Sequence, residues 1–184
     1  MIMELASPAL DLRYPVGPFK APATISADDR DRFIAEIERL PGLLRSAIAG
    51  LNDQQLDTPY REAGWTVRQV VHHLADSHMN SFVRFKWALT EDSPTIKPYD
   101  EAACAELADA GRGMPVDSSL MLLDGLHQRW TVLLRSMDER QYRRTFQHPE
   151  RGLMMLDVNL AMYAWHCRHH TAHIVSLRDR MGWR

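Results

Sequence analysis

The sequence has 184 residues, of which 45% are hydrophobic and 25% are charged, and its formal net charge is −2. This length and composition are typical of one globular domain, so we expect residues 1–184 to form a single domain with a sizeable core. The near-neutral charge argues against the basic surface by which proteins bind nucleic acid or anionic membranes, and we expect neither partner.

The N-terminus and the cysteines indicate the cellular compartment. Met1 to Leu10 has no basic segment followed by a long apolar run, which is the pattern of a signal peptide. No stretch approaches the roughly eighteen apolar residues of a membrane-spanning helix. Two cysteines, Cys104 and Cys167, are too few for a disulfide framework. We therefore expect a cytoplasmic protein.

The first part of the chain is predicted to be an extended arm followed by a helix. Residues 1–25 contain four prolines, which interrupt any helix. Ser26 to Asp29 resembles a capping box, and apolar residues follow it at helical spacing as far as Leu51. Pro41 lies within this run, where it should kink the helix or begin a second one.

The clearest helix start of the chain is Thr66 with Gln69, a second capping box, and this helix should run to about Thr90. Prolines then mark a loop, followed by a short helix near residues 100–108.

The last third of the chain predicts two more long helices. One follows a cap at Asp117 or Ser118 and ends near Met137. Residues 138–156 are mixed and could hold a small hairpin, after which Asp157 should cap the final helix. Four long amphipathic helices with few strand signals indicate an all-α, antiparallel-type four-helix bundle.

Four histidines fall within eight residues of the final helix: His166, His169, His170 and His173. At about 100° per residue, His166 and His170 lie on the apolar stripe of this helix, whereas His169 is expected to face water. Two imidazoles one turn apart can bind one cation. They can equally be packed or solvated without a catalytic role.

A second histidine cluster, His72, His73 and His78, lies on the helix that begins after Thr66. The same count places His78 at the centre of the apolar stripe. It places His73 off the stripe, on a polar face with three side chains: Ser77, Asn80 and Arg84. Periodicity alone therefore favours His78 as the buried histidine, which could be an inert core residue.

The segment Gly64–Asn80 resembles the second helix of the YfiT proteins, a group of metal-dependent hydrolases within the DinB-like superfamily. Further matching segments extend over nearly the whole chain: Arg13–Gly17, Gln55–Arg61, Lys97–Glu101, His127–Trp130, Trp165–His170 and Arg180–Trp183. The resemblance implies a DinB/YfiT-like four-helix bundle with an extended N-terminal arm.

The resemblance also implies a metal site. In that family one divalent ion is held by the histidine of a His-Leu pair on the second helix and by two histidines four residues apart on the last. Carried onto this sequence, the ligands are His73, His166 and His170. The helical count also places His166 and His170 on the inward face of their helix. It does not place His73 on an apolar face, and for His73 we follow the resemblance. His78 then becomes a core residue or a neighbour of a ligand.

Three histidine ligands leave a coordination position free, which is typical of catalytic rather than structural zinc. The free position can hold water, polarise a carbonyl or ionise a thiol. We therefore expect hydrolysis of a small-molecule substrate. The alternatives are a thiol S-transferase that uses a low-molecular-weight thiol, like the related bacillithiol S-transferases, and a metal-binding stress protein without turnover. Zinc is the expected ion, although nickel or another first-row ion suits nitrogen ligands.

Other expectations concern single residues and assembly. His127 could lie behind a metal ligand, but a surface pair with Asp124 is the favoured interpretation, and His148 should face solvent in a loop. The resemblance implies a homodimer, which apolar side chains of the arm at residues 14–19 could support. The sequence assigns no residue to proton transfer.

Overall fold

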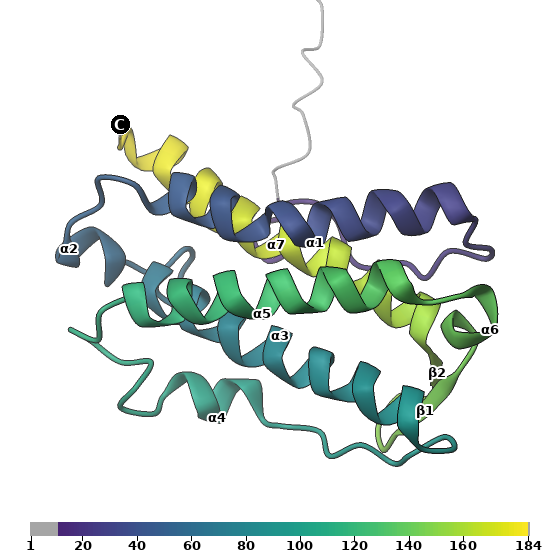
Figure 1. The fold of residues 1–184 in the computed structure, drawn as a ribbon. Helices are drawn as coiled ribbons and strands as arrows, with labels where there is room; N and C mark the ends of the chain where they lie inside the picture. Colours follow the sequence, from purple (N-terminus) through teal and green to yellow (C-terminus); the bar gives the residue numbers. More distant parts are fainter. Residues whose placement is uncertain (1–10, 184) are drawn as a thin grey trace, which may run out of the picture.

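The computed structural model describes residues 11–183, and its core is a bundle of four long helices (Figure 1). They are α1 (Ala27–Ile48), α3 (Val67–Thr90), α5 (Asp117–Ser136) and α7 (Leu156–Met181). Three short helices, α2 (Asp53–Leu56), α4 (Glu101–Ala105) and α6 (Glu139–Tyr142), lie in the connections. The predicted hairpin is present as strands β1 (Thr145–His148) and β2 (Gly152–Met155), which pair antiparallel. The all-α fold class is confirmed.

The order of the helices differs from a simple antiparallel bundle. Helix α1 packs against α5 and α7, and α3 packs against the same two helices. In Figure 1, α1 and α7 run in one direction and α3 and α5 in the other. Residues 91–116 carry the chain back along the bundle, so α5 begins at the same end as α3. The expected antiparallel arrangement therefore holds for the α1–α5 and α3–α7 pairs only.

Two of the predicted helix starts are confirmed and two are wrong. The side chains of Ser26 and Thr66 cap α1 and α3, each in a capping box. Helix α5 begins at Asp117 after Val116, with no side-chain cap. Helix α7 begins at Leu156 because the backbone of β2 leads directly into it. Asp157 instead forms an ion pair with Arg30 of α1, at 2.8 Å.

Helix α1 continues through Pro41 without a break. Proline has no N–H, so the carbonyl of Ile37, four residues earlier, has no donor from position 41. Both residues are buried, and a buried carbonyl normally finds a partner elsewhere. The partner lies on α5 and belongs to the site described below.

The described part of the arm, residues 11–25, packs against α7. The indole nitrogen of Trp165 donates to the carbonyl of Gly17 at 3.0 Å, and His173 Nε2 donates to the carbonyl of Arg13 at 3.2 Å. Gly17 has φ +78°, a conformation that favours glycine, and this reversal brings its carbonyl to Trp165. Residues 1–10 of the predicted arm lie outside the described residues.

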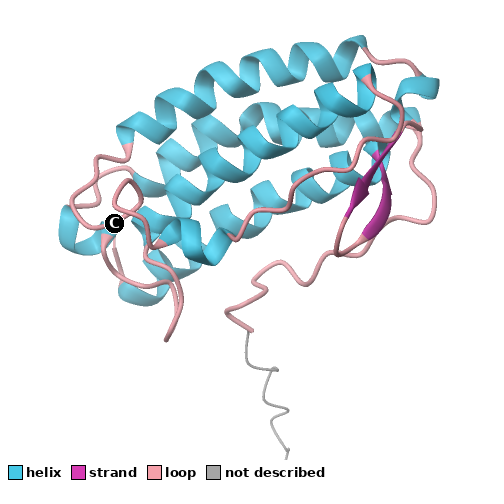
Figure 2. Cartoon of the chain, turned by 90° about the horizontal axis from the view of Figure 1, so that it is seen from below, coloured by secondary structure: helices cyan, strands magenta, loops and turns pink. Residues whose placement is uncertain are grey.

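The hairpin and the loop after α3 lie together at one end of the bundle (Figure 2). The amide of Ile96 donates to the carbonyl of Gln147 at 3.0 Å, and the amide of Gln147 donates to the carbonyl of Pro94 at 2.9 Å. These hydrogen bonds hold the first part of the segment 91–116 beside β1, where this segment begins to run back along the bundle. Among the described residues, no helix is long and apolar enough to cross a membrane.

Candidate metal centre

Antiparallel packing of α3 and α7 brings His73, His166 and His170 together. One ring nitrogen of each lies within 4.8 Å of the others, and Nε2 of His73 is 3.2 Å from Nε2 of His166. Ligand nitrogens bound tetrahedrally to zinc at about 2.0–2.1 Å stand about 3.3 Å apart. The indole of Trp65 packs over His73, with ring centroids 4.6 Å apart, and helps to exclude water. The spacing fits one small divalent ion.

A chain of hydrogen bonds sets the tautomer of His166. His127 Nδ1 lies 2.6 Å from the carbonyl of Ile37, which can only accept, so Nδ1 carries the proton and Nε2 is an acceptor. His78 Nδ1 then donates to His127 Nε2 at 3.0 Å. His166 Nδ1 in turn donates to His78 Nε2 at 3.1 Å. The lone pair of His166 is therefore at Nε2, which faces His73. This series of hydrogen bonds begins at the Ile37 carbonyl, which has no donor from Pro41.

Burial keeps these imidazoles neutral. Burial lowers the pKa of His73 to about 4, with a smaller effect from His173. Burial also lowers the pKa of His166 and His170 well below the usual value, with His73 among the further causes. Nδ1 of His170 is buried and has no hydrogen-bond partner within residues 11–183. Neutral imidazoles with an unpartnered nitrogen are suited to bind a metal.

A second triplet, His169, His170 and His173, also has ring nitrogens within 4.8 Å. All three side chains are buried, so the expectation that His169 faces water is wrong: the arm covers that side of α7, and Tyr14 packs on His169. His173 donates to the arm and stacks on Tyr60 with ring centroids 3.9 Å apart. This triplet is drawn from one helix, and the arm contacts two of its members, His169 and His173.

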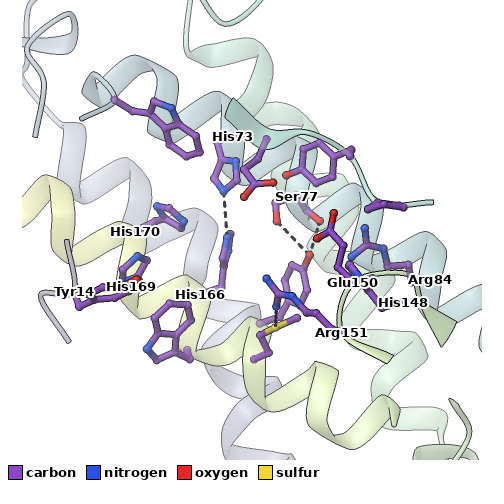
Figure 3. Close-up of a pocket in the computed structure, with 17 residues that line it drawn as sticks. Tyr14, His73, Ser77, Arg84, His148, Glu150, Arg151, His166, His169 and His170 are labelled. Carbon is purple, nitrogen blue, oxygen red and sulfur yellow. Dashed lines mark hydrogen bonds between the residues drawn. The ribbon is translucent and has the colours of Figure 1, made fainter. Parts of the chain in front are cut away.

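All three members of the first triplet line a cavity of about 400 Å³ (Figure 3), whereas His173 of the second triplet does not. Helix α3 contributes His73, Ser77 and Arg84 to its wall, as the polar face of the sequence predicts. Asn80 is not part of the wall, and its amide donates to the carbonyl of Asp76 instead, at 2.9 Å. The remaining wall comes mostly from α7, the arm, the loop after α3 and the hairpin: Tyr14, Trp65, Pro98, Tyr99, Glu101, His148, Glu150, Arg151, Met162, Tyr163, Trp165, His166, His169 and His170.

Two histidines expected at the surface are buried. His127 is 2% exposed because α5 turns it between α1 and α3, and its expected partner Asp124 pairs with Arg45. His148 is 6% exposed because the hairpin folds back over the cavity. His78, expected in the core or beside a ligand, is fully buried in contact with His166. The aromatic wall residues Tyr14 and Tyr99 lie within the segments that matched the family, but nothing in the sequence placed either of them at the site.

Comparison with known proteins shows the family to which the chain belongs. A model of the DinB superfamily matches residues 36–174. A relative from Bacillus mycoides, provisionally named a metal-dependent hydrolase, is 56% identical over 173 residues, which are 94% of this chain and 99% of that protein. A relative from Geobacillus thermodenitrificans with the same provisional name is 56% identical over 174 residues, covering 94% and 97% of the two chains.

A solved structure is similar over the same length. YfiT from Bacillus subtilis, described as a probable metal-dependent hydrolase with an unusual four-helix bundle topology, superposes with a TM-score of 0.91. It is 50% identical, and the match covers 94% of this chain and 99% of that one.

Proposed function

This chain belongs to the DinB superfamily, and on that premise we propose that it is a metal-dependent hydrolase of a small molecule. The observation that carries the proposal is the open histidine triplet on the wall of a substrate-sized cavity. A structural metal site is usually closed by a fourth protein ligand, whereas a catalytic site keeps one position for water or substrate.

We assign the ligands as His73, His166 and His170. The 3.2 Å separation of the Nε2 atoms of His73 and His166 supports this set. Only this triplet joins two helices and lies wholly on the cavity wall. Zinc suits three neutral nitrogens, and nickel or another first-row ion would compete for the same set.

The residues of the cavity account for the other requirements of hydrolysis. A divalent ion at the triplet supplies Lewis-acid chemistry, which lowers the pKa of a water molecule or polarises a carbonyl. Trp65, Trp165 and Met162 give the cavity an apolar wall that would hold a substrate body and exclude bulk water. The carboxylates of Glu101 and Glu150 line the same cavity and are our candidates for the general base.

The test is a two-step measurement on protein purified without a metal-affinity tag. Elemental analysis should find about one divalent ion per chain. A panel of small esters and amides should then be cleaved with water alone, and a chelator should abolish the cleavage. Turnover that appears only after a small thiol is added would replace hydrolysis by thiol transfer. A metal-bearing protein that cleaves none of the panel, with or without thiol, would favour the non-catalytic alternative.

We also propose a cytoplasmic homodimer. The described arm packs on its own chain, with Phe19 against Trp165 at a centroid distance of 5.9 Å, so it does not by itself require a partner. Tyr14 and Val16 of the arm stay exposed. Light scattering at micromolar concentration should give twice the chain mass of 21.2 kDa. A monomer would refute the proposal.

A further inference from the structure

One buried arginine faces the cavity without a partner. Arg84 is 6% exposed and lines the cavity, yet within residues 11–183 its guanidinium forms no hydrogen bond and no ion pair. A largely buried cation without a counter-charge is costly, because it has lost most of its water without gaining an anionic partner. A carboxylate or phosphate can satisfy a guanidinium through two parallel hydrogen bonds. Arg84 therefore lacks a partner of that kind.

Another arginine of the same helix shows how this chain treats a structural charge. Arg68 is 1% exposed, and its guanidinium donates to Asp57 at 2.7 Å and to Asp53 at 2.8 Å. It also donates to the carbonyl of Met114, at 2.6 Å. Arg68 ties the loops at one end of the bundle to α3. Arg84 has none of these partners.

Two uncharged donors, His148 and Tyr99, line the same cavity as Arg84. His148 Nδ1 accepts from the amide of Glu150 at 3.2 Å, so in its neutral form the proton is on Nε2. The hydroxyl of Tyr99 is buried without a hydrogen-bond partner among the described residues and lines the same cavity. The carboxylates of Glu101 and Glu150 belong to exposed residues on the rim, and neither pairs with Arg84.

Figure 3 shows His73, His166 and His170 at one end of the cavity and Arg84, His148 and Arg151 at the other. His73 and Arg84 are eleven residues apart on α3, which at about 100° and 1.5 Å per residue places them on one face, about 16 Å apart along the axis. A ligand that reaches both ends must be elongated. Because the cavity is only about 400 Å³, it must also be small.

We propose that Arg84, His148 and Tyr99 form an anion subsite, which binds a carboxylate or phosphate group of an elongated substrate. Arg84 is the anchoring residue. The identity of this anion as part of the substrate rests on the proposed hydrolase function; binding of the anion does not. The reacting group of such a substrate would lie at the histidine end.

The direct test is calorimetric titration of the full chain, freed of metal by a chelator, with inorganic phosphate, hexanoate and neutral hexanamide. Metal-free protein is used because an anion could otherwise bind the ion. At least one of the two anions should bind and hexanamide should bind more weakly, and the stronger anion identifies the chemistry. Arg84→Met should weaken binding at least tenfold, and Arg84→Lys should have an intermediate effect, because lysine keeps the charge without the two parallel bonds. Arg143→Met removes an exposed arginine outside the cavity and should change nothing.

A folding measurement keeps the test decisive. Removal of an unpaired buried charge should leave the melting temperature of Arg84→Met unchanged or raise it. If that variant fails to fold, Arg84→Lys carries the comparison. Unaltered anion binding in both variants, or no anion binding by the native chain, would overturn the subsite.

A second experiment tests the anion subsite separately from the proposed hydrolase function. In metal-loaded protein, esters that carry a distal carboxylate should be cleaved with a higher kcat/KM than their neutral analogues, and Arg84→Met should erase the difference. Anion binding that depends on Arg84, without cleavage of any ester, would reject the hydrolase and keep the subsite. Cleavage of esters without anion binding would reject the subsite and keep the hydrolase.

Discussion

The buried polar groups of the bundle divide into an inner set and a cavity set. In the inner set, Arg68, His78 and His127 use their hydrogen-bonding groups within the protein. In the cavity set, His170 leaves a buried Nδ1 without a partner, and Arg84, a buried residue on the cavity wall, forms no hydrogen bond or ion pair among the described residues. Residue type and burial are the same in both sets. What separates the two sets is that the cavity groups combine an unpartnered donor or acceptor with a place on the cavity wall, whereas an unpartnered atom such as Trp130 Nε1 lies in the core.

Loss of a cavity histidine should have the largest effect. His73→Ala or His170→Ala should lower metal affinity roughly a thousandfold, since the few ligands of a zinc site share about 10 kcal/mol or more of binding free energy. Competition with a chromophoric chelator measures the affinity. The control is His72→Ala, a buried neighbour whose Nδ1 lies 2.8 Å from Ser119 Oγ, away from the triplet. An equal loss in His173→Ala would place the ion in the second triplet, His169, His170 and His173.

Loss of an inner charge should act on stability instead. Arg68→Met should lower the free energy of unfolding by about 3 kcal/mol or more, because it leaves the part-buried Asp57 carboxylate without its partner. Urea unfolding of the metal-free protein measures the change. Arg84→Met provides the comparison, with no expected loss. Equal destabilisation by the two substitutions would remove the distinction between the two sets of groups.

The link between the two sets can be tested at His127. His127→Phe removes the residue that fixes the tautomer of His78, and through it that of His166. Outer residues that orient metal ligands typically contribute about 10–100-fold to affinity, so a loss in that range is expected. His72→Phe, which alters a buried histidine outside the chain of hydrogen bonds, should leave the affinity unchanged. Similar losses in both variants would mean that general loosening of the core, and not the tautomer, is responsible.

The smallest effect concerns pH. Burial lowers the pKa of His127 to about 4, with the Ile37 carbonyl opposing the shift, so between pH 4 and about 6.5 the unfolded chain binds more protons there than the folded chain. Stability must rise with pH across this window and be lost as pH falls through it. Between pH 7 and pH 5.5, His127 should account for about 1 kcal/mol of that loss. Urea unfolding at both values should show a correspondingly smaller change in His127→Phe.

Burial also changes the acid limit expected for metal binding. Ordinary histidines would release a metal as pH falls through about 6 to 7. The pKa of His73 is lowered to about 4, so protons compete with the ion only at lower pH. We expect the ion to be retained at pH 6, as elemental analysis after dialysis at that pH would show.

Local signals explain how much of the fold the sequence predicts. The capping boxes at Ser26 and Thr66 and the apolar spacing after them depend on neighbours within one turn, and these elements are confirmed. The direction of α5 depends on how far residues 91–116 travel, which no local pattern encodes. The start of α7 was misplaced because Asp157, a suitable cap, is used by Arg30 of another helix.

The site was predictable where one face of a helix decides the outcome, as for His166 and His170. His169 was misplaced because a helical count assumes one buried stripe and takes no account of the arm, which covers another face of α7. His148 was misplaced because a loop position is expected to be exposed, whereas the hairpin buries it on the cavity wall. His73 came from the family resemblance alone. The chain of hydrogen bonds through His78 and His127 joins three helices and a carbonyl, and sequence spacing cannot show it.

Pro41 has a consequence for engineering this protein. A proline inside a helix costs about 3 kcal/mol relative to alanine, so a search for heat-resistant variants would readily select Pro41→Ala. That substitution returns an in-helix donor to the Ile37 carbonyl, which then competes with His127 for it. Pro41→Ala would thus raise thermal stability and lower metal affinity, although Pro41 lies outside the cavity wall. Variants selected by heat alone should be re-examined for metal content before any loss of activity is attributed to the cavity.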